Sequence, residues 1–411
     1  MTPTRDRQTI PLGAVPPTGS RHQGRRSAVA LTDDLVVAGT ADGSVRAFDR
    51  ESLTEIWQHS KSAGSVVSTA TTAERIAVGE RGPAGAVRLY DAAGDVRWRY
   101  ETATDVGEPQ KDTRFFLPFV VDVAATGSRV FVAARRYERR GERPEGERRH
   151  FESVVYAFES DGTVAWRYET DGSPIALDTG GDRLAVAYNR CTGDHQRGLV
   201  VLDTGDGGER WSWDPGTDGQ RRVGDVTLLD AGAVVTGHGD YRGYALDEGG
   251  DVRWRADLAT PREIDGETVY AYPNHVHATS KGVLFVTGNT YPEEGRETDV
   301  LHPEEHTAFG YGPAGERQWT DPVGGFASGI DACGRVVAVP CAQNFRQRDA
   351  DVHACRLFEV RDGRRGGIDT AGVATAAALD ESGVAVVEEP VRYHDEGTVR
   401  GEYALHVADR P

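Results

Sequence analysis

The sequence contains very little cysteine and methionine. Among its 411 residues there are one methionine and four cysteines. No two cysteines have the C-x-x-C spacing, and four cysteines are too few to frame a fold of this size. The cysteines are Cys191, Cys333, Cys341 and Cys355. We therefore expect reduced thiols and no disulfide framework.

Long apolar runs are also missing. No stretch approaches the roughly 18 consecutive apolar residues of a membrane-spanning helix. Residues 1–20 are polar and proline-rich and lack the apolar core of a signal peptide. Arg25 and Arg26 precede a short apolar stretch, but Asp33 and Asp34 interrupt it too early for a twin-arginine signal. We expect a cytoplasmic protein that does not insert into a membrane.

Lysine is rare on a strongly acidic chain. The 65 acidic and 47 basic residues give a net charge of −18, and only Lys61, Lys111 and Lys281 are lysines. A dense carboxylate surface keeps a protein hydrated and monodisperse where salt screens its self-repulsion. This pattern indicates a monomer from an extreme halophile; the alternative is an ordinary acidic protein encoded by a GC-rich genome. In both cases duplex DNA and anionic lipid are disfavoured as partners.

What the sequence does contain is a repeat. Six tryptophans each end the same phrase, namely Trp57, Trp98, Trp166, Trp211, Trp254 and Trp319. Upstream of each stands a small or aliphatic residue, then a bulky apolar residue and usually an acid, as in Ala47-Phe48-Asp49 and Ala157-Phe158-Glu159. Weaker copies are Ala308-Phe309-Gly310, which precedes Trp319, and Leu357-Phe358-Glu359 and Ala404-Leu405-His406, which have no tryptophan. Successive phrases are spaced by 42 to 49 residues, with two longer intervals.

Each repeat has the pattern of a four-stranded meander. A second apolar run, such as Val36-Val37, lies before each phrase, and one more short strand and a turn precede that run. A blade of this length cannot bury both of its faces without neighbours, so stacking the units radially is favoured. We predict an all-β, eight-bladed β-propeller of four-stranded antiparallel blades, with seven blades as the alternative. Residues 21–411 form the single propeller domain, and Thr9 to Leu12 within segment 1–20 is the candidate strand that completes the last blade.

The phrase from Gly43 to Trp57 resembles the repeat of the pyrroloquinoline-quinone (PQQ) propeller family. The resemblance extends from about Ala28 to Ala408 and implies that the small residue and the tryptophan dock adjacent blades against each other. That family includes cofactor-dependent alcohol dehydrogenases and the cofactor-free BamB lipoprotein of membrane assembly, so function stays open. The quinone enzymes use a vicinal cysteine pair and a calcium-bound cofactor held by carboxylates. Because no Cys-Cys occurs here, we expect no PQQ and no other cofactor.

Long insertions are confined to one side of the predicted blades. They are 135–151, 289–306, 341–354 and 389–401, with the linkers 100–118 and 256–274. The candidate binding residues that they carry are Arg136, Tyr137, Phe345 and Arg346, together with Tyr291 and Tyr393 on the same rim. The basic segment Arg135 to Arg149 is either a solvated arm interleaved with glutamates or a docking arm for an acidic partner or RNA.

A second candidate site lies on the predicted inner strands. His275 and His277 alternate with Val276, so both imidazoles point the same way and form a weak metal or ligand candidate together with Asn274. Asp122 and Asp225 fall on comparable strands. The alternative is a hydrogen-bonded channel lining.

One motif is set aside. His302 to His306 satisfies the H-x-x-E-H zinc-protease pattern, but a proline follows the first histidine in a predicted loop, and the motif needs a helix.

We therefore predict a non-catalytic binding or scaffolding propeller that captures a protein or small ligand on its long-loop face. The alternative is an enzyme with a channel-centred site around His275, His277, Asp122 and Asp225.

Overall fold

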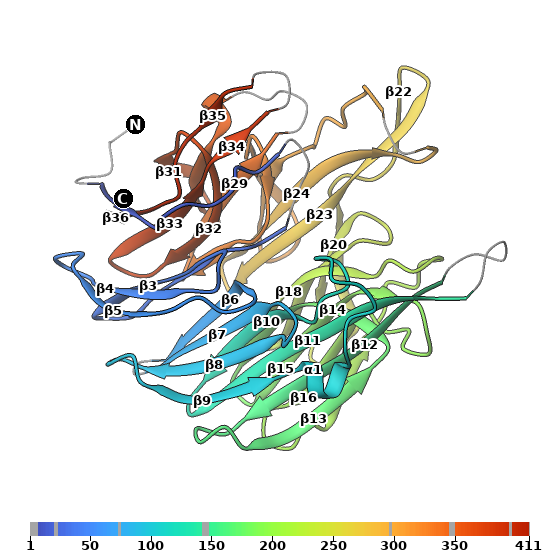
Figure 1. The fold of residues 1–411 in the computed structure, drawn as a ribbon. Coiled ribbons are helices and arrows are strands. Elements are labelled where there is room, and N and C mark those ends of the chain that lie inside the picture. The colour runs from blue at the N-terminus through green and yellow to red at the C-terminus, as the bar shows by residue number, and fades with distance from the viewer. Residues whose placement is uncertain are drawn as a thin grey trace. The chain divides into compact units, whose positions relative to one another are not determined.

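The computed structural model describes residues 7–19, 24–72, 75–141, 148–295, 298–344, 350–393 and 397–410. The chain divides into two compact units, residues 26–230 and residues 1–25 with 231–411, which are treated separately below. Almost all regular structure is antiparallel β-sheet (Figure 1). No helix among these residues is both long enough and apolar enough to cross a membrane.

The unit of residues 26–230 consists of successive meanders of four strands. The first two meanders are β2 (Ala28–Leu31), β3 (Leu35–Gly39), β4 (Val45–Asp49) and β5 (Glu55–His59), then β6 (Ser65–Thr72), β7 (Arg75–Arg81), β8 (Ala86–Asp91) and β9 (Val96–Glu101). The short helix α1 (Ala103–Val106) follows β9. Next come β10 (Phe119–Thr126), β11 (Arg129–Arg140), β12 (Arg148–Phe158) and β13 (Val164–Thr170), then β14 (Gly172–Gly180), β15 (Arg183–Cys191), β16 (Leu199–Asp203) and β17 (Glu209–Trp213), and finally β18 (Val223–Leu229).

The second unit continues the same pattern. Its first strands are β19 (Gly232–Gly237), β20 (Arg242–Leu246) and β21 (Val252–Asp257), followed by β22 (Arg262–Ile264), β23 (Glu267–Thr279), β24 (Gly282–Pro292), β25 (Thr307–Tyr311) and β26 (Arg317–Pro322). The next sheet contains β27 (Phe326–Ala327), β28 (Asp331–Cys333), β29 (Val336–Gln343), β30 (Ala354–Glu359) and β31 (Gly363–Asp369), with the 3₁₀ turn η1 (Ala350–Val352) before β30. The last strands are β32 (Val373–Leu379), β33 (Gly383–Glu389), β34 (Val391–Arg392), β35 (Val399–Arg400) and β36 (Ala404–Asp409).

The first segment of the chain supplies a strand to the last sheet. Strand β1 (Gln8–Pro11) pairs antiparallel with β36, with Ile10 opposite Leu405. The sheet order is therefore β1-β36-β33-β32. Because β1 covers the edge of β36, that strand has no exposed ladder of unpaired backbone groups.

The repeated phrase forms the third strand of each meander, and its small residue lies opposite the tryptophan. Ala47 is opposite Trp57 and Ala157 is opposite Trp166, and in both pairs the register shifts at the following residue. The same β-bulge follows the residue opposite the tryptophan in the other tryptophan repeats. In the Trp319 repeat that residue is Gly310, so the predicted phrase starting at Ala308 was placed two residues too early. A bulge increases local twist and redirects the next side chain. The acid after the bulge then reaches the turn, as in the hydrogen bond from the Asp95 amide to Asp91.

The tryptophans pack against the following sheet. Trp166 is 8% exposed, and its indole N–H donates to the Thr204 carbonyl at 3.1 Å in the turn between β16 and β17. Trp57, Trp254 and Trp319 make the equivalent hydrogen bond to Ala92, Pro313 and Val360. A side-chain carbon at Gly207 would lie 2.7 Å from the Trp166 ring, so this turn has room only for glycine, which also adopts φ of +74° there.

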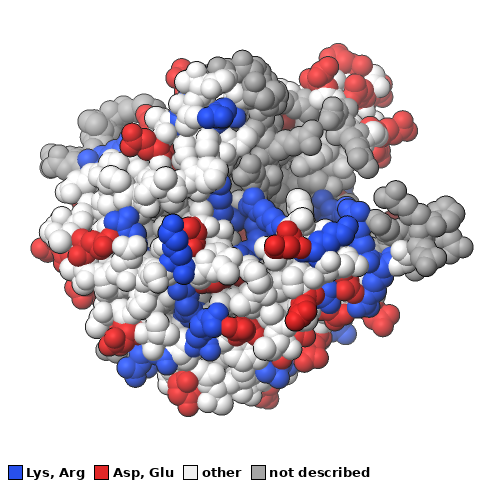
Figure 2. All heavy atoms as spheres, in the orientation of Figure 1, with Lys and Arg blue, Asp and Glu red and all other residues white. Residues whose placement is uncertain are grey.

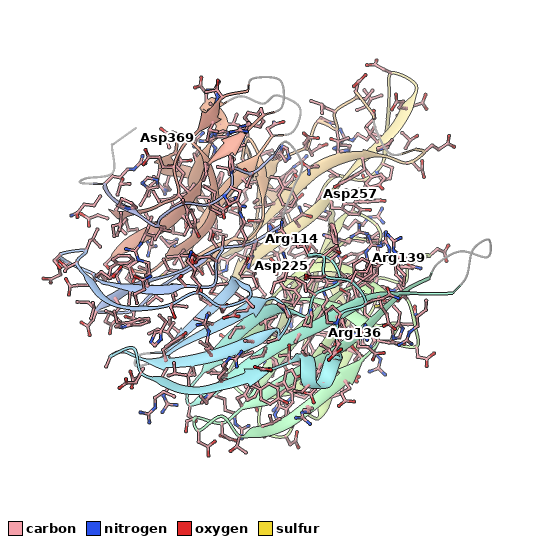
Figure 3. All side chains as sticks on the ribbon, in the orientation of Figure 1. Arg114, Arg136, Arg139, Asp225, Asp257 and Asp369 are labelled. Atoms are coloured by element: carbon pink, nitrogen blue, oxygen red, sulfur yellow. The ribbon has the colours of Figure 1, made fainter. Side chains whose placement is uncertain are left out.

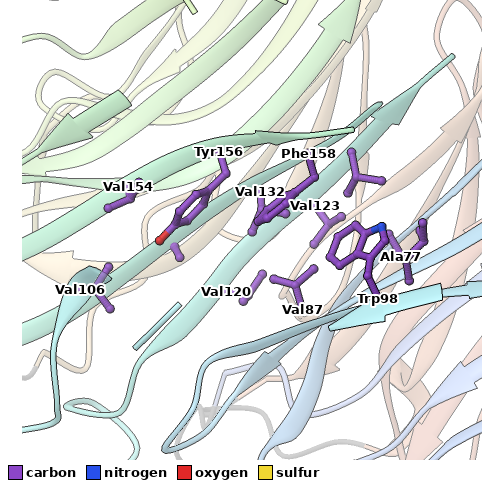
Figure 4. Close-up of a cluster of buried hydrophobic side chains, with 13 residues drawn as sticks. Ala77, Val87, Trp98, Val106, Val120, Val123, Val132, Val154, Tyr156 and Phe158 are labelled. Carbon is purple, nitrogen blue, oxygen red and sulfur yellow. The ribbon is translucent and has the colours of Figure 1, made fainter. Parts of the chain in front are cut away.

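Buried apolar side chains fill the space between neighbouring sheets. In the cluster of Figure 4, Trp98 and Val87 from one meander pack against Val120, Val132 and Phe158 from the next. The rings of Trp98 and Phe158 stack with centroids 4.9 Å apart. Each indole therefore buries its area between sheets, which explains why the sequence repeats a tryptophan at this position.

Several segments expected to be loops are strand extensions. β11 and β12 pair in register as far as Arg140 and Arg148, and β23 and β24 pair as far as Val269 and Pro292 (Figure 1). Residues 135–140 and 148–151 were expected to belong to a long loop, and this was wrong because they are paired strand residues. Alternating aromatic side chains on one face stabilise this hairpin, since Tyr137 lies opposite Phe151 with ring centroids 5.5 Å apart.

Candidate functional site

The first candidate group comprises the carboxylates of the inner strands. Asp122 Oδ2 accepts a hydrogen bond from the Leu177 amide at 3.0 Å, and its Oδ1 accepts one from the Ser68 hydroxyl. The carboxylate thus joins the inner strands β6, β10 and β14. Asp225 accepts a hydrogen bond from the Val226 amide at 2.9 Å on its own strand.

Two further inner-strand aspartates, which the sequence analysis missed, make the same contact. Asp178 accepts from the Leu228 amide and Asp331 accepts from the Leu379 amide, each at 2.6 Å. Burial raises the pKa of Asp178 to about 7 and that of Asp331 to about 6. The signal was present in the sequence, because each aspartate precedes a glycine turn on its inner strand. These groups tie neighbouring strands together through backbone amides.

The candidate histidines also contact the backbone. His275 Nε2 is 3.0 Å from the Ala327 carbonyl, and His277 Nε2 is 2.8 Å from the Gly334 carbonyl. The side chain of Asn274 packs over Gly288. The two imidazoles thus form hydrogen bonds with different backbone carbonyls of the following sheet. Among the residues that the structure describes, neither histidine belongs to a group of three possible metal ligands.

The cysteines are separated in the sequence, and the inner-strand carboxylates have backbone partners. The sequence has no adjacent cysteine pair, and Cys191, Cys341 and Cys355 are buried free thiols. The carboxylates of Asp122 and Asp178 are already engaged by backbone amides of neighbouring strands.

The H-x-x-E-H segment is a turn rather than a metal-binding helix. The side chain of His302 is buried and its Nε2 lies 3.0 Å from the Thr260 carbonyl, while His306 Nε2 lies 2.7 Å from Asn289 Oδ1. His306 has a φ of +45°, which no α-helix contains. The side chains fix the loop between β24 and β25, as expected from its proline.

The β11–β12 hairpin carries the predicted rim residues Arg136 and Tyr137. Arg136 is 8% exposed; it donates to the Val106 carbonyl and pairs with Glu138, both at 2.6 Å. Its charge is therefore used inside the chain rather than presented on the rim. Tyr137 packs against Phe116 and Phe151. Phe345 and Arg346 lie outside the described residues. Tyr393 was expected on the same rim, but it is fully buried and its hydroxyl lies 2.6 Å from His353 Nε2.

Glu138, His150 and Glu152 place possible metal-ligand atoms within 4.8 Å of one another on this hairpin. The guanidinium of Arg140 already bridges both carboxylates, and His150 Nε2 lies 2.7 Å from Glu152. A cation would have to displace Arg140 and would also meet the charge of Arg136. The group is therefore an ion-pair network. Lys and Arg side chains gather beside this hairpin, where Figure 3 labels Arg136 and Arg139 (Figure 2).

An aromatic surface lies in the second unit, where β23 begins and β24 ends. Tyr270 is opposite Tyr291 in the strand register, and Tyr272 follows on the same face. The rings of Tyr241 and Tyr270 pack with centroids 4.3 Å apart and planes inclined at 34°, and the rings of Tyr272 and His238 have centroids 4.9 Å apart. We call Tyr241, Tyr270, Tyr272 and Tyr291 the tyrosine cluster. Only Tyr291 was predicted from the sequence, although the alternation of Tyr270 and Tyr272 was a visible signal.

The tyrosine cluster is partly exposed and locally strained. Tyr291 is 39% exposed, and Tyr241 has a φ of +64°, a conformation that is unfavourable for a bulky residue. The hydroxyl groups of Tyr270 and Tyr272 form a hydrogen bond with an oxygen–oxygen distance of 3.4 Å. Burial is the largest cause that raises the pKa of Tyr270, and the hydrogen bond with the Tyr272 hydroxyl raises it further. The Tyr270 phenol therefore stays neutral near pH 7.

Exposed carboxylates lie at the same end of the β23–β24 pair as the tyrosine cluster. Glu263, Asp265 and Glu267 are exposed at the β22–β23 end, and Glu293 and Glu294 are exposed just after β24. Figure 2 shows this acidic group at the tip that β22 forms in Figure 1. The surface thus combines a packed aromatic centre with an anionic rim.

Antiparallel four-stranded meanders joined by tryptophan contacts are the architecture of PQQ-like β-propellers. The chain belongs to this family: the model described as outer membrane protein assembly factor BamB matches residues 20–141 and 118–354. No curated protein sequence matches the chain.

Many solved structures are similar to this chain, and three of them illustrate the range. BamB from Moraxella catarrhalis is 14% identical, with a TM-score of 0.58 over 94% of this chain and 99% of BamB. A quinohemoprotein alcohol dehydrogenase from Pseudomonas putida HK5 is 10% identical, with a TM-score of 0.56 over 96% of this chain and 76% of the enzyme. The WD40 repeats of RRP9 are 12% identical, with a TM-score of 0.51 over 98% of both chains. At these identities the likeness concerns the fold.

Proposed function

We propose that this chain is a non-catalytic, protein-binding propeller of eight blades that captures a partner through the tyrosine cluster. The observation that carries the proposal is the packing of four tyrosines, one of them well exposed, on a hairpin that extends beyond its sheet. Tyrosines supply large contact area at low entropic cost and are enriched among residues that dominate binding energy. The exposed carboxylates around the cluster favour a partner segment that carries lysine or arginine.

The eight-blade count rests on the meanders themselves. Each of the phrases from Val45–Asp49 to Ala404–Asp409 is the third strand of one antiparallel meander, and β1 completes the last one. An experimental structure with seven closed blades would contradict this count.

The proposal is tested by quantitative capture from native lysate with Tyr291→Ala and Tyr270→Ala variants. We expect both variants to lose the same captured protein by at least about tenfold, because a central aromatic contributes about 2 kcal/mol or more to binding. The captured protein should then bind the purified wild-type chain directly, with affinity that falls as salt increases.

Lys281→Ala is the matched control. Lys281 lies in the tight turn between β23 and β24, at the opposite end of the same two strands from Tyr270 and Tyr291. Capture should be unchanged in this variant. The proposal fails if Lys281→Ala abolishes capture or if both tyrosine variants retain it while remaining folded by circular dichroism.

A further inference from the structure

Two arginines and one phenylalanine form a row across three strands of the first unit. Phe119 on β10 lies opposite Arg81 on β7 and opposite Arg135 on β11. The Arg81 guanidinium carbon lies 3.7 Å from the centre of the Phe119 ring, and that of Arg135 lies 5.4 Å from the same ring. Two cations therefore share one aromatic ring.

Arg135 is also flanked by a second ring. Its guanidinium carbon lies 5.4 Å from the centre of Phe151 on β12. Ser153, which lies opposite Arg135, donates its hydroxyl to the Gly172 carbonyl and does not compensate the charge. The aromatic rings hold the guanidinium in place and restrict its contact with water.

No acceptor meets this guanidinium among the residues that the structure describes. The Nε of Arg135 is enclosed and has no hydrogen-bond partner. Burial lowers the pKa of Arg135 to about 10, and no neighbouring carboxylate opposes that effect. The adjacent Arg136, in contrast, pairs with Glu138 and with the Val106 carbonyl.

A half-buried charge without a counter-ion is costly, and buried polar groups are normally paired. The chain has 65 acidic residues, so a partner could easily have been supplied from within. A planar guanidinium between two rings is well suited to receive a carboxylate through two parallel hydrogen bonds.

We propose that Arg135 is a receptor for a carboxylate that a ligand brings, with Phe119 and Phe151 as the walls of the site. The carboxylate belongs either to an acidic side chain of a protein or to a free organic acid. This site does not involve the tyrosine cluster, so it stands or fails independently of that surface.

The test compares stabilisation by two matched probes at constant ionic strength. N-acetylglutamate amide carries the carboxylate, and N-acetylglutamine amide is its uncharged counterpart. The wild-type chain should show a saturable rise in Tm with the first probe only, because a ligand that binds the folded state stabilises it. A capped triglutamate peptide and citrate form the second arm: tighter binding of the peptide identifies a protein source, and tighter binding of citrate an organic acid.

Three variants complete the experiment. Arg135→Met should remove the carboxylate response while leaving Tm equal or higher, since it removes an uncompensated charge. Arg135→Lys should weaken the affinity by about tenfold, because lysine cannot form two parallel bonds. Arg136→Met, the neighbouring and fully partnered arginine, should lower Tm and keep the response. The proposal is overturned if the wild type does not respond, or if Arg135→Met or Arg135→Lys responds like the wild type.

Discussion

Trp166 and Gly207 provide a quantitative test of how neighbouring sheets are held together. Trp166→Ala removes a buried indole and its hydrogen bond to Thr204, so it should lower the free energy of unfolding by about 3–5 kcal/mol. Gly207→Ala places a methyl group against the unchanged indole at a φ of +74°. It should cost about 2–4 kcal/mol, from backbone strain plus overpacking.

The two effects should not add. Once Trp166 is alanine, the added methyl group at Gly207 has space, and only the backbone strain of about 1–2 kcal/mol remains. Gly181→Ala isolates that strain, because Gly181 has a φ of +63° and nothing within 4 Å of the added carbon. The four proteins of the cycle and the Gly181 control should be compared by guanidinium unfolding followed by far-ultraviolet circular dichroism.

The contact between Trp166 and position 207 predicts a measurable coupling free energy. The coupling between the two positions should be about 1–2 kcal/mol, within the range measured for residues in contact. Additivity to within about 0.5 kcal/mol would refute the packing of Trp166 against this turn. A Trp166→Ala cost below about 1 kcal/mol would refute its role as a buried docking group.

Three further outcomes are expected. Burial raises the pKa of Asp178 to about 7, so the folded chain binds more protons than the unfolded chain between about pH 4 and pH 7. The free energy of unfolding should therefore fall with rising pH in this range, by up to about 1.4 kcal/mol per pH unit. Asp178→Asn should flatten this slope in denaturant titrations at several pH values. Deleting residues 1–12 should expose the edge of β36 and promote aggregation in light scattering, whereas deleting residues 1–6 should not. Equilibrium titration with PQQ and calcium should give no saturable binding, and saturable binding would contradict our view of the inner strands.

Much of the fold could be predicted because the repeat places the same physical constraint in every unit. Ala47 and Trp57 were identified as partners in one phrase, and they lie opposite each other across β4 and β5. The small residue and the large ring that pack together lie within a few residues of each other in the sequence. The local pattern is therefore sufficient to predict their contact. Even the weak strand Gln8–Pro11 could be anticipated, since the final phrase lacked a fourth strand.

The length of the hairpins could not be predicted by the same means. Residues 135–140 are mostly arginine and glutamate, a composition that favours a solvated loop. In the structure, Arg136 lies opposite Glu152 across the two strands, and Arg140 contacts both Glu138 on its own strand and Glu152 on β12, although Arg139 and Arg140 lie opposite Arg149 and Arg148. Such cross-strand pairing depends on register, which composition does not contain.

The candidate sites show a further limit. His275 and His277 have the spacing of ligands, but each contacts a backbone carbonyl of the next sheet, a partner about 50 residues away that carries no side-chain signature. The tyrosine cluster joins Tyr241, Tyr270 and Tyr291 from three strands, and only the pairing of β23 with β24 brings the last two together. Arg135 is distinguished because its Nε finds no hydrogen-bond partner among the described residues, a property that depends on the positions of its neighbours in space. In a repeat fold, sequence therefore identifies the residues that recur, and the candidate sites found here consist of residues that depart from the recurrence.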